Sequence, residues 1–149
     1  MRAFATAIVA VGIVGLAACG GDGAGGELSA AEFRERADAI CTDTAKKVDA
    51  VPQPRSLDEV ETYFDRVVPI FRDQTDRLKE LDPPDDLQED WDRAMELQED
   101  SVDVAEDAQA AAKDGDEGKI REALDRGGKN EEELHRLAAR LGLKTCGRG

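Results

Sequence analysis

The residue types that perform most enzymatic chemistry are scarce in this chain. It holds one histidine, three cysteines, one tryptophan and one tyrosine among 149 residues, and aromatic residues make up 4% of the total. A single histidine excludes metal sites built from several histidines, and Tyr63 and Trp91 are too few and too separated to form a platform for sugars or bases. The one long apolar run, residues 3–18, contains two glycines and is shorter than the roughly 20 apolar residues of a membrane-spanning helix.

This apolar run and the cysteine that follows it predict an exported protein. The run comes after a positively charged N-terminus and ends in Leu16-Ala17-Ala18-Cys19, which resembles the lipobox of bacterial lipoproteins. The resemblance implies that residues 1–18 are a signal peptide and that the Cys19 sulfur receives a diacylglyceryl group. Acyl chains such as palmitate would then hold the protein on the extracytoplasmic face of the cell membrane. The alternative is ordinary signal-peptidase cleavage near Ala17, which leaves no lipid.

Glycine follows the cysteine, and acidic residues dominate the remainder. Residues 19–28 form a glycine-rich tether, which as a flexible chain spans roughly 15–18 Å. Removing residues 1–18 removes one positive charge, that of Arg2, so the formal net charge moves from −14 to −15. A surface this acidic disfavours DNA, RNA and anionic headgroups, whose charge has the same sign. The membrane is therefore expected as a partner through the N-terminal lipid, and nucleic acid is not expected as a partner.

Capping motifs and prolines divide the rest of the chain into helices. Ser29-Ala-Ala-Glu32 and Ser56-Leu-Asp-Glu59 match the capping box, in which a serine and a glutamate bond each other's backbone amides. The first predicts a helix over residues 30–48, and the second predicts a helix over residues 57–81. Pro69 removes one hydrogen bond of that second helix, but the apolar register continues past it, so a kink is expected rather than an end.

Two further helices are expected after Pro83-Pro84. Asp85 or Asp86 is the expected N-cap of the third, which runs to the turn at residues 113–116. The fourth is expected to continue unbroken over residues 116–141 despite Gly127-Gly128, because apolar residues on both sides of the pair keep the same heptad phase. The alternative is a new helix capped by Asn130.

These four segments predict an all-α fold, an up-down-up-down four-helix bundle over residues 29–149. The residues expected to face its core are Phe33, Ala37, Ile40 and Val48 in the first segment, Leu57, Val60, Phe64, Val67, Phe71, Leu78 and Leu81 in the second, Leu87, Trp91, Ala94, Met95, Val102, Ala105 and Ala108 in the third, and Ile120, Ala123, Leu124, Leu134, Leu137, Ala138 and Leu141 in the fourth.

The three cysteines predict one disulfide. If Cys19 carries the lipid, Cys41 and Cys146 remain as a pair in an oxidising compartment. Gly142 can reverse the chain, and an extended segment from there to Cys146 reaches roughly 16–18 Å, just enough to meet Cys41 on the first helix. The C-terminal tail should then lie in the groove beside that helix, with Leu143 packed inward. Two buried free thiols are the alternative.

Motifs of metal binding occur only in fragments. Glu132-Glu-Leu-His135 has the Glu-x-x-His spacing of di-iron bundles, but such sites need the motif on two helices, so an exposed histidine flanked by Glu131 and Glu132 is the better interpretation. From Asp114 onward the chain resembles the start of a calcium-binding loop. Lys119 stands at its sixth position, where that loop needs glycine, so a helix cap is the better interpretation there. No metal site or cofactor is expected.

Catalytic groups are also accounted for by structural roles. Ser29 and Ser56 are expected in caps, Ser101 lies inside a helix, and the cysteine pair is expected as a disulfide, which leaves His135 without a nucleophile. No phosphate-binding glycine loop is present. Trp91 is interpreted as a core residue, with a place in a pocket wall as the alternative. We therefore expect no catalytic residues.

The segment Ala37-Asp-Ala-Ile-Cys41, together with Gly142-Leu-Lys-Thr-Cys-Gly147 and the pair Pro83-Pro84, is similar to a group of small lipid-anchored, secreted helical proteins of actinobacteria. The resemblance spans the mature domain, and it implies an architecture and a location without implying an activity. The pair Gly127-Gly128 is not part of that pattern. The sequence is thus interpreted as a non-enzymatic cell-envelope lipoprotein that binds an unknown envelope protein or small ligand. The alternative is a carrier of a lipid or other apolar ligand between its helices.

Overall fold

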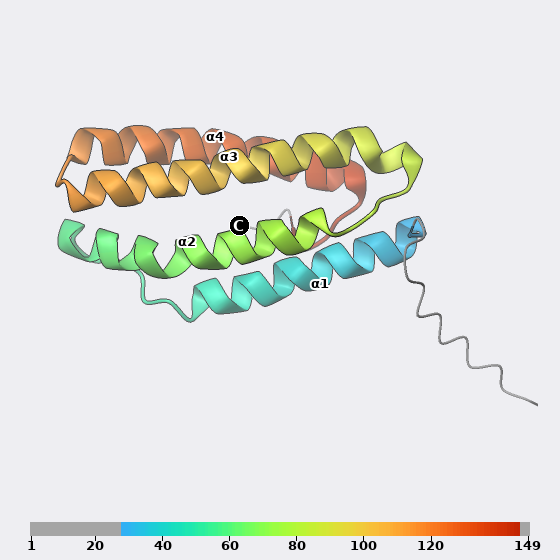
Figure 1. Ribbon diagram of the computed structural model, residues 1–149, viewed down its shortest axis with the longest axis horizontal. Helices are drawn as coiled ribbons and strands as arrows, with labels where there is room; N and C mark the ends of the chain where they lie inside the picture. The colour runs from blue at the N-terminus through green and yellow to red at the C-terminus, as the bar shows by residue number, and fades with distance from the viewer. Residues whose placement is uncertain (1–27, 147–149) are drawn as a thin grey trace, which may run out of the picture.

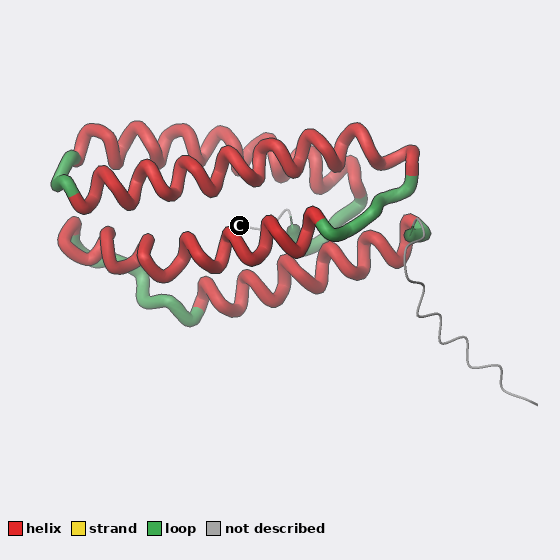
Figure 2. Tube along the Cα trace, in the orientation of Figure 1, coloured by secondary structure: helices red, strands yellow, loops and turns green. Residues whose placement is uncertain are grey.

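The computed structural model describes residues 28–146, and this part of the chain is helical (Figures 1 and 2). The predicted signal peptide, the lipidation site Cys19 and nearly all of the tether lie outside the described residues. Four helices follow one another with alternating direction, as expected for an up-down-up-down bundle. They are α1 (Ala30–Asp49), α2 (Leu57–Lys79), α3 (Gln88–Lys113) and α4 (Glu117–Leu141), with the short 3-10 helix η1 (Asp85–Leu87) before α3. The all-α bundle is thereby confirmed.

Helix α1 begins with the predicted capping box. The Ser29 side chain accepts a hydrogen bond from the Glu32 backbone N–H at 3.3 Å, while the Glu32 carboxylate accepts the Ser29 backbone N–H at 3.2 Å. The Ser29 hydroxyl, and then the Ser29 backbone N–H, donate hydrogen bonds to the Glu32 carboxylate and thereby lower the pKa of Glu32. Two N–H groups at the start of the helix are thereby satisfied, so the first turn is defined by residues three positions apart.

Helix α2 continues through Pro69 without a break, as the apolar register indicated. Its predicted capping box is wrong. Ser56 is the N-cap but makes no side-chain capping bond, and the Glu59 carboxylate accepts the Arg55 backbone N–H at 2.7 Å instead of that of Ser56. The Glu59 carboxylate could accept the backbone N–H of either Arg55 or Ser56, and the conformation of the loop before α2 determines which of the two it binds.

The start of α3 also differs from the prediction. Asp85 is the first residue of η1, and the N-cap of α3 is Leu87, which makes no side-chain capping bond. The Leu87 N–H bonds the Pro84 carbonyl at 2.8 Å, so the proline pair leads into a tight turn that carries the chain into the helix. Pro83 and Pro84 are both buried, so packing rather than a side-chain cap defines this helix start.

Helix α4 is continuous from Glu117 to Leu141, which confirms the prediction across Gly127-Gly128. Asp116 is its N-cap, and the bond at 3.0 Å that its carboxylate accepts from the Lys119 N–H lowers the pKa of Asp116. This confirms the helix-cap interpretation of the calcium-loop-like segment.

The core is divided into two clusters along the length of the bundle. The first cluster draws on all four helices and η1, and its buried members are Phe33, Ala37, Ile40, Cys41, Leu78, Leu87, Trp91, Ala94, Met95, Leu97, Leu137 and Leu141. Buried members of the second cluster come from α2, α3 and α4 alone, and they are Phe64, Val67, Val68, Val104, Ala108 and Ala123. The second cluster lacks buried α1 residues because α1 extends along only part of α2, as Figure 1 shows.

The shortness of α1 explains the one core prediction that fails clearly. Leu124 was expected to face inward, but it is 58% exposed, whereas Ala138, fourteen residues later on the same face of α4, is 5% exposed. Near Ala138, α1 and the C-terminal tail contribute side chains to the first cluster, and Leu143 N–H bonds the Ala138 carbonyl at 2.8 Å. Near Leu124 the neighbouring cluster has no α1 residue, so the same helix face meets solvent.

Candidate functional site

The C-terminal tail is bound to α1 at several points. Helix α4 ends at Gly142, whose φ of 75° is the left-handed conformation that glycine adopts most easily. Arg34 on α1 donates a hydrogen bond from Nε to the Leu141 carbonyl at 2.7 Å. A Cβ atom on Gly142 would lie 2.8 Å from Arg34 Nε, so a side chain at this position would displace the arginine.

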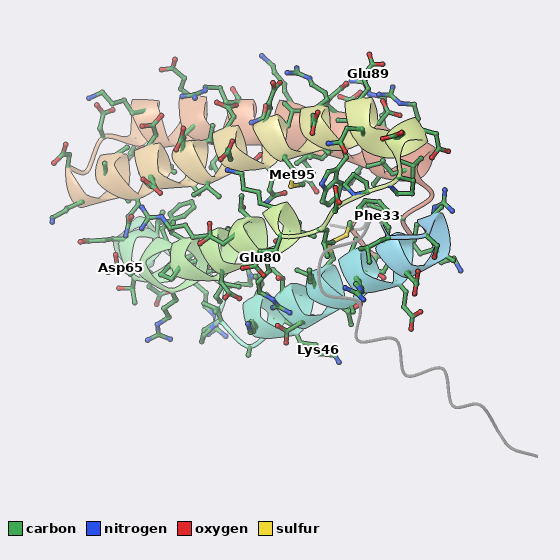
Figure 3. All side chains as sticks on the ribbon, turned by 45° about the vertical axis from the view of Figure 1, so that its right-hand side comes forward. Phe33, Lys46, Asp65, Glu80, Glu89 and Met95 are labelled. Atoms are coloured by element: carbon green, nitrogen blue, oxygen red, sulfur yellow. A yellow bond between two sulfur atoms is a disulfide. The ribbon has the colours of Figure 1, made fainter. Side chains whose placement is uncertain are left out.

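Asp38 receives the tail beyond this turn. Its Oδ1 accepts the backbone N–H groups of Lys144 at 2.9 Å and Thr145 at 2.7 Å, and its Oδ2 lies 3.1 Å from the Lys144 nitrogen. The tail then joins Cys146 to Cys41 in a disulfide with Sγ atoms 2.04 Å apart and Cα atoms 5.1 Å apart. Figure 3 shows this bond in yellow beside Phe33, which points into the interior.

The structure thus confirms the predicted pairing and the predicted course of the tail. Leu143 and Cys146 pack against the first cluster as partly buried residues. The roles of Arg34 and Asp38 were not anticipated. The available signal was their spacing, because residues 34, 38 and 41 follow the i, i+4, i+7 pattern that puts side chains on one face of a helix.

His135 lies where the non-metal interpretation placed it. Its Nε2 is 3.7 Å from the Glu131 carboxylate one turn earlier, and the side chain is 41% exposed. Glu132, the other member of the Glu-x-x-His spacing, is exposed. Within residues 28–146, no three His, Cys, Asp or Glu side chains come together in a way that could hold a metal ion.

Two of the three serine hydroxyls considered as nucleophiles have structural partners, while the third, that of Ser56, makes no side-chain capping bond. Ser29 is engaged in its capping box, and Ser101 Oγ donates to the Leu97 carbonyl at 2.7 Å within the same helix. Trp91 is 3% exposed and packs edge-to-face on Phe33 with ring centroids 4.8 Å apart. The prediction of a core role for Trp91 is confirmed.

An ion-pair network joins α1 to α2 near the middle of the bundle. Asp43 Oδ2 lies 2.7 Å from Arg77 and 3.0 Å from Lys47, and Lys47 lies 3.1 Å from Asp73. The guanidinium of Arg77, and then the ammonium of Lys47, lower the pKa of Asp43, while Asp43 and then Asp73 raise the pKa of Lys47. These side chains are about half exposed to solvent, so the network orients the two helices more than it stabilises them.

A surface groove lies where α1 has ended. The loop of residues 50–56 and the first turns of α2 border a hollow of about 510 Å³, which we call the distal groove. Its walls carry two prolines, one tyrosine, two arginines and three other polar residues, namely Pro52, Gln53, Pro54, Arg55, Glu59, Thr62, Tyr63 and Arg66. The distal groove is at the end of α1 opposite to the end that receives the tether.

No protein-family model, no curated protein and no solved structure matches this chain. The disulfide and the hydrogen bonds from α1 hold the tail against the first core cluster, whereas the distal groove is open to solvent beside the second cluster, on which its Tyr63 packs.

Proposed function

We propose that the protein is a cell-envelope lipoprotein, anchored by lipid on Cys19 at the outer face of the membrane, with a bundle that binds another envelope component. The observation that carries the proposal is the Cys41–Cys146 bridge. A disulfide of this kind persists in an oxidising compartment, and it leaves Cys19 as the one cysteine without a sulfur partner. That cysteine is the residue that the lipobox-like segment requires.

None of the helices within residues 28–146 is long and apolar enough to cross a membrane. Since one acyl chain binds membranes marginally and two or more bind stably, diacylglyceryl attachment at Cys19 is a sufficient anchor. The tether of residues 19–28 would hold the bundle close to the membrane without determining its orientation.

The binding role is favoured over an enzymatic role by the state of the reactive side chains. Cys41 and Cys146 are joined to each other, the hydroxyls of Ser29 and Ser101 have partners in their own helices, and His135 contacts a carboxylate. A carrier of an apolar ligand would need a cavity that opens into the core. The distal groove instead runs along the surface beside the loop and α2, which favours the binding role.

Detergent phase separation of bacterial membranes tests the anchor. The wild-type protein should enter the detergent phase, and a Cys19→Ser variant should stay in the aqueous phase, because it lacks the sulfur that receives the lipid. A Cys41→Ser/Cys146→Ser variant is the matched control, since it also loses cysteine sulfur but should keep the anchor. Wild-type protein in the aqueous phase would show that the lipoprotein proposal is wrong.

Cross-linking on intact cells tests the binding role. The anchored protein should recover a defined set of envelope components, identified by mass spectrometry of proteins and lipids. The Cys19→Ser variant, released from the membrane, should recover fewer of them. Recovery of lipid alone in stoichiometric amount would instead favour the carrier.

A further inference from the structure

The distal groove exists because α1 and α2 differ in where they end. Helix α1 stops at Asp49, and the chain then runs through Pro52 and Pro54 alongside the first turns of α2. Prolines restrict the backbone and have no N–H to continue a helix, so this loop cannot extend α1 over the second core cluster. A furrow is left between the loop and α2, in the quadrant that a longer first helix would fill.

The charge of the distal groove is opposite to that of the molecule. The chain carries 34 acidic and 20 basic residues, yet Arg55 and Arg66 both line the groove, and Glu59 supplies the one carboxylate among the lining residues that the structure describes. The Glu59 carboxylate already accepts the Arg55 backbone N–H at 2.7 Å. The groove therefore presents two guanidinium groups and one occupied anion.

Neither arginine has an ion-pair partner among residues 28–146. The other arginines of α2 differ in this respect, since Arg72 pairs with Glu106 and Arg77 pairs with Asp43. In a chain with an excess of carboxylates, partners are available at most positions of a helix surface. Arg55 and Arg66 thus keep their hydrogen-bond donors available to a molecule in the groove.

Apolar side chains line the same groove as the two arginines. Pro52 and Pro54 supply flat apolar rings, and the Tyr63 ring is partly buried, with its hydroxyl 3.5 Å from Gln53 Nε2. Phe64 meets the Tyr63 ring edge-to-face at a centroid distance of 5.7 Å and thereby supports it from the core side. Arginine and tyrosine are the residue types that contribute most to binding energy at protein interfaces.

We propose that the distal groove binds a short acidic segment of a partner protein, in which carboxylates flank an apolar side chain. The guanidinium fork of arginine pairs two donors with a carboxylate, which fits Arg55 and Arg66. The apolar side chain would lie against Tyr63 and the prolines. From Glu59 to Arg66 the helical wall extends about 10 Å, the length of a few extended residues rather than of a single ion.

The acidity of the whole molecule does not oppose this partner at close range. Charges are screened over about 8 Å at physiological ionic strength, so the two arginines at the contact outweigh the more distant carboxylates. Long-range repulsion between the acidic protein and the acidic segment slows their encounter. Binding therefore depends on close contacts between the segment's carboxylates and both arginines. Because the distal groove faces away from the tether, a partner can reach it while the protein is anchored; this part of the inference rests on the proposed function.

Fluorescence anisotropy with labelled peptides tests the proposal on the full-length protein in detergent micelles. The probe is Asp-Glu-Phe-Asp-Glu, and the matched probes are Asn-Gln-Phe-Asn-Gln and Asp-Glu-Ser-Asp-Glu. We expect saturable binding of the first peptide and weaker binding of the other two. An Arg55→Glu/Arg66→Glu variant should bind the first peptide about tenfold more weakly, because two exposed ion pairs are lost.

An Arg36→Glu/Arg136→Glu variant is the control, because it changes the net charge equally on exposed positions toward the tether end of α1 and the C-terminal end of α4. It should bind within about twofold of wild type, since Arg36 lies 13 helical residues, about 20 Å, from the end of α1 that borders the groove, beyond the screening length. Equal weakening in both variants, equal affinity for the neutral peptide, or no saturable binding would each overturn the proposal. Circular dichroism should show the same helix content and melting temperature in both variants, so that loss of binding reports on the groove.

Failure of this proposal is distinguishable from failure of the proposed function. If cross-linking on cells still recovers a partner with the Arg55→Glu/Arg66→Glu variant, the lipoprotein binds elsewhere and the groove assignment is wrong. If Cys19→Ser remains membrane-bound, the anchor is wrong, whatever the peptides show.

Discussion

Asp38 holds the C-terminal tail on α1 by hydrogen bonds to its backbone. One carboxylate accepts two consecutive backbone N–H groups, those of Lys144 and Thr145. A charged acceptor makes hydrogen bonds that are stronger than those between neutral groups. The tail has no regular secondary structure to satisfy these amides, so the carboxylate replaces the bonds that a helix would have supplied.

We predict that Asp38→Ala lowers the free energy of unfolding by about 1–2 kcal/mol, because the amides of Lys144 and Thr145 lose a charged acceptor at a partly exposed site. Hydrogen exchange followed by NMR should show faster exchange of these two amides. Glu35→Ala, at an exposed position of the same helix, is the control and should change neither quantity. Unchanged exchange at residues 144 and 145 in Asp38→Ala would contradict the assigned role.

At the scale of a single helix, the glycines of α4 and of its C-terminus have opposite roles. A Cβ atom on Gly128 would meet no atom within 4 Å, and a Cβ atom on Gly127 would meet Val104 at an ordinary 3.6 Å. Neither glycine is required by packing, and both lower helix propensity. Gly142 has a positive φ and a close contact with Arg34, so its lack of a side chain is required.

We predict that Gly128→Ala raises the free energy of unfolding by about 0.5–1 kcal/mol, since alanine restricts the unfolded chain and favours the helix. Gly142→Ala should lower it by about 1–2 kcal/mol or more, because an alanine there is strained and displaces Arg34. Urea unfolding measures the free energy of unfolding of both variants, and the slope of this free energy against urea concentration should be unchanged. A destabilised Gly128→Ala would indicate that this helix face has a contact outside the described bundle.

For the molecule as a whole, the disulfide is the link that holds both ends of the domain together. It joins residues 105 positions apart, and it attaches the tail to the helix that contributes to only one of the two core clusters. Constraining so long a loop restricts the unfolded chain strongly. The first cluster, which contains Cys41, should therefore depend on the bridge more than the second cluster does.

We predict that Cys41→Ala/Cys146→Ala lowers the free energy of unfolding by up to about 4–5 kcal/mol, the chain-entropy value for a loop of this length. Thiol labelling of the denatured, unreduced Cys19→Ser protein should find no reactive cysteine, and two should appear after reduction. Two reactive cysteines before reduction would show that the thiols are free in the mature protein.

Much of this architecture was predictable, because it depends on residues close together in sequence. The helix over residues 57–79 passes through Pro69 because its apolar register is intact on both sides, and α4 passes through its glycine pair for the same reason. The Cys41–Cys146 pair followed from the number of cysteines and the reach of the tail. The distal groove was not predictable, because its loop and helix walls are brought together only when α1 ends short of the second cluster.

The sequence by itself determined the four helices, since prolines and a period of 3.6 residues act within one or two turns. It also determined the pairing of Cys41 with Cys146, through the number of cysteines and the reach of the tail. Only the tertiary structure decided the rest. Leu124 and Ala138 have the same place in the helical pattern, yet one is exposed and the other is buried. Asp38 looks like any exposed carboxylate until the tail, more than a hundred residues later, returns to it. Burial and hydrogen bonding depend on what arrives from distant parts of the chain, and local periodicity contains no information about that arrival.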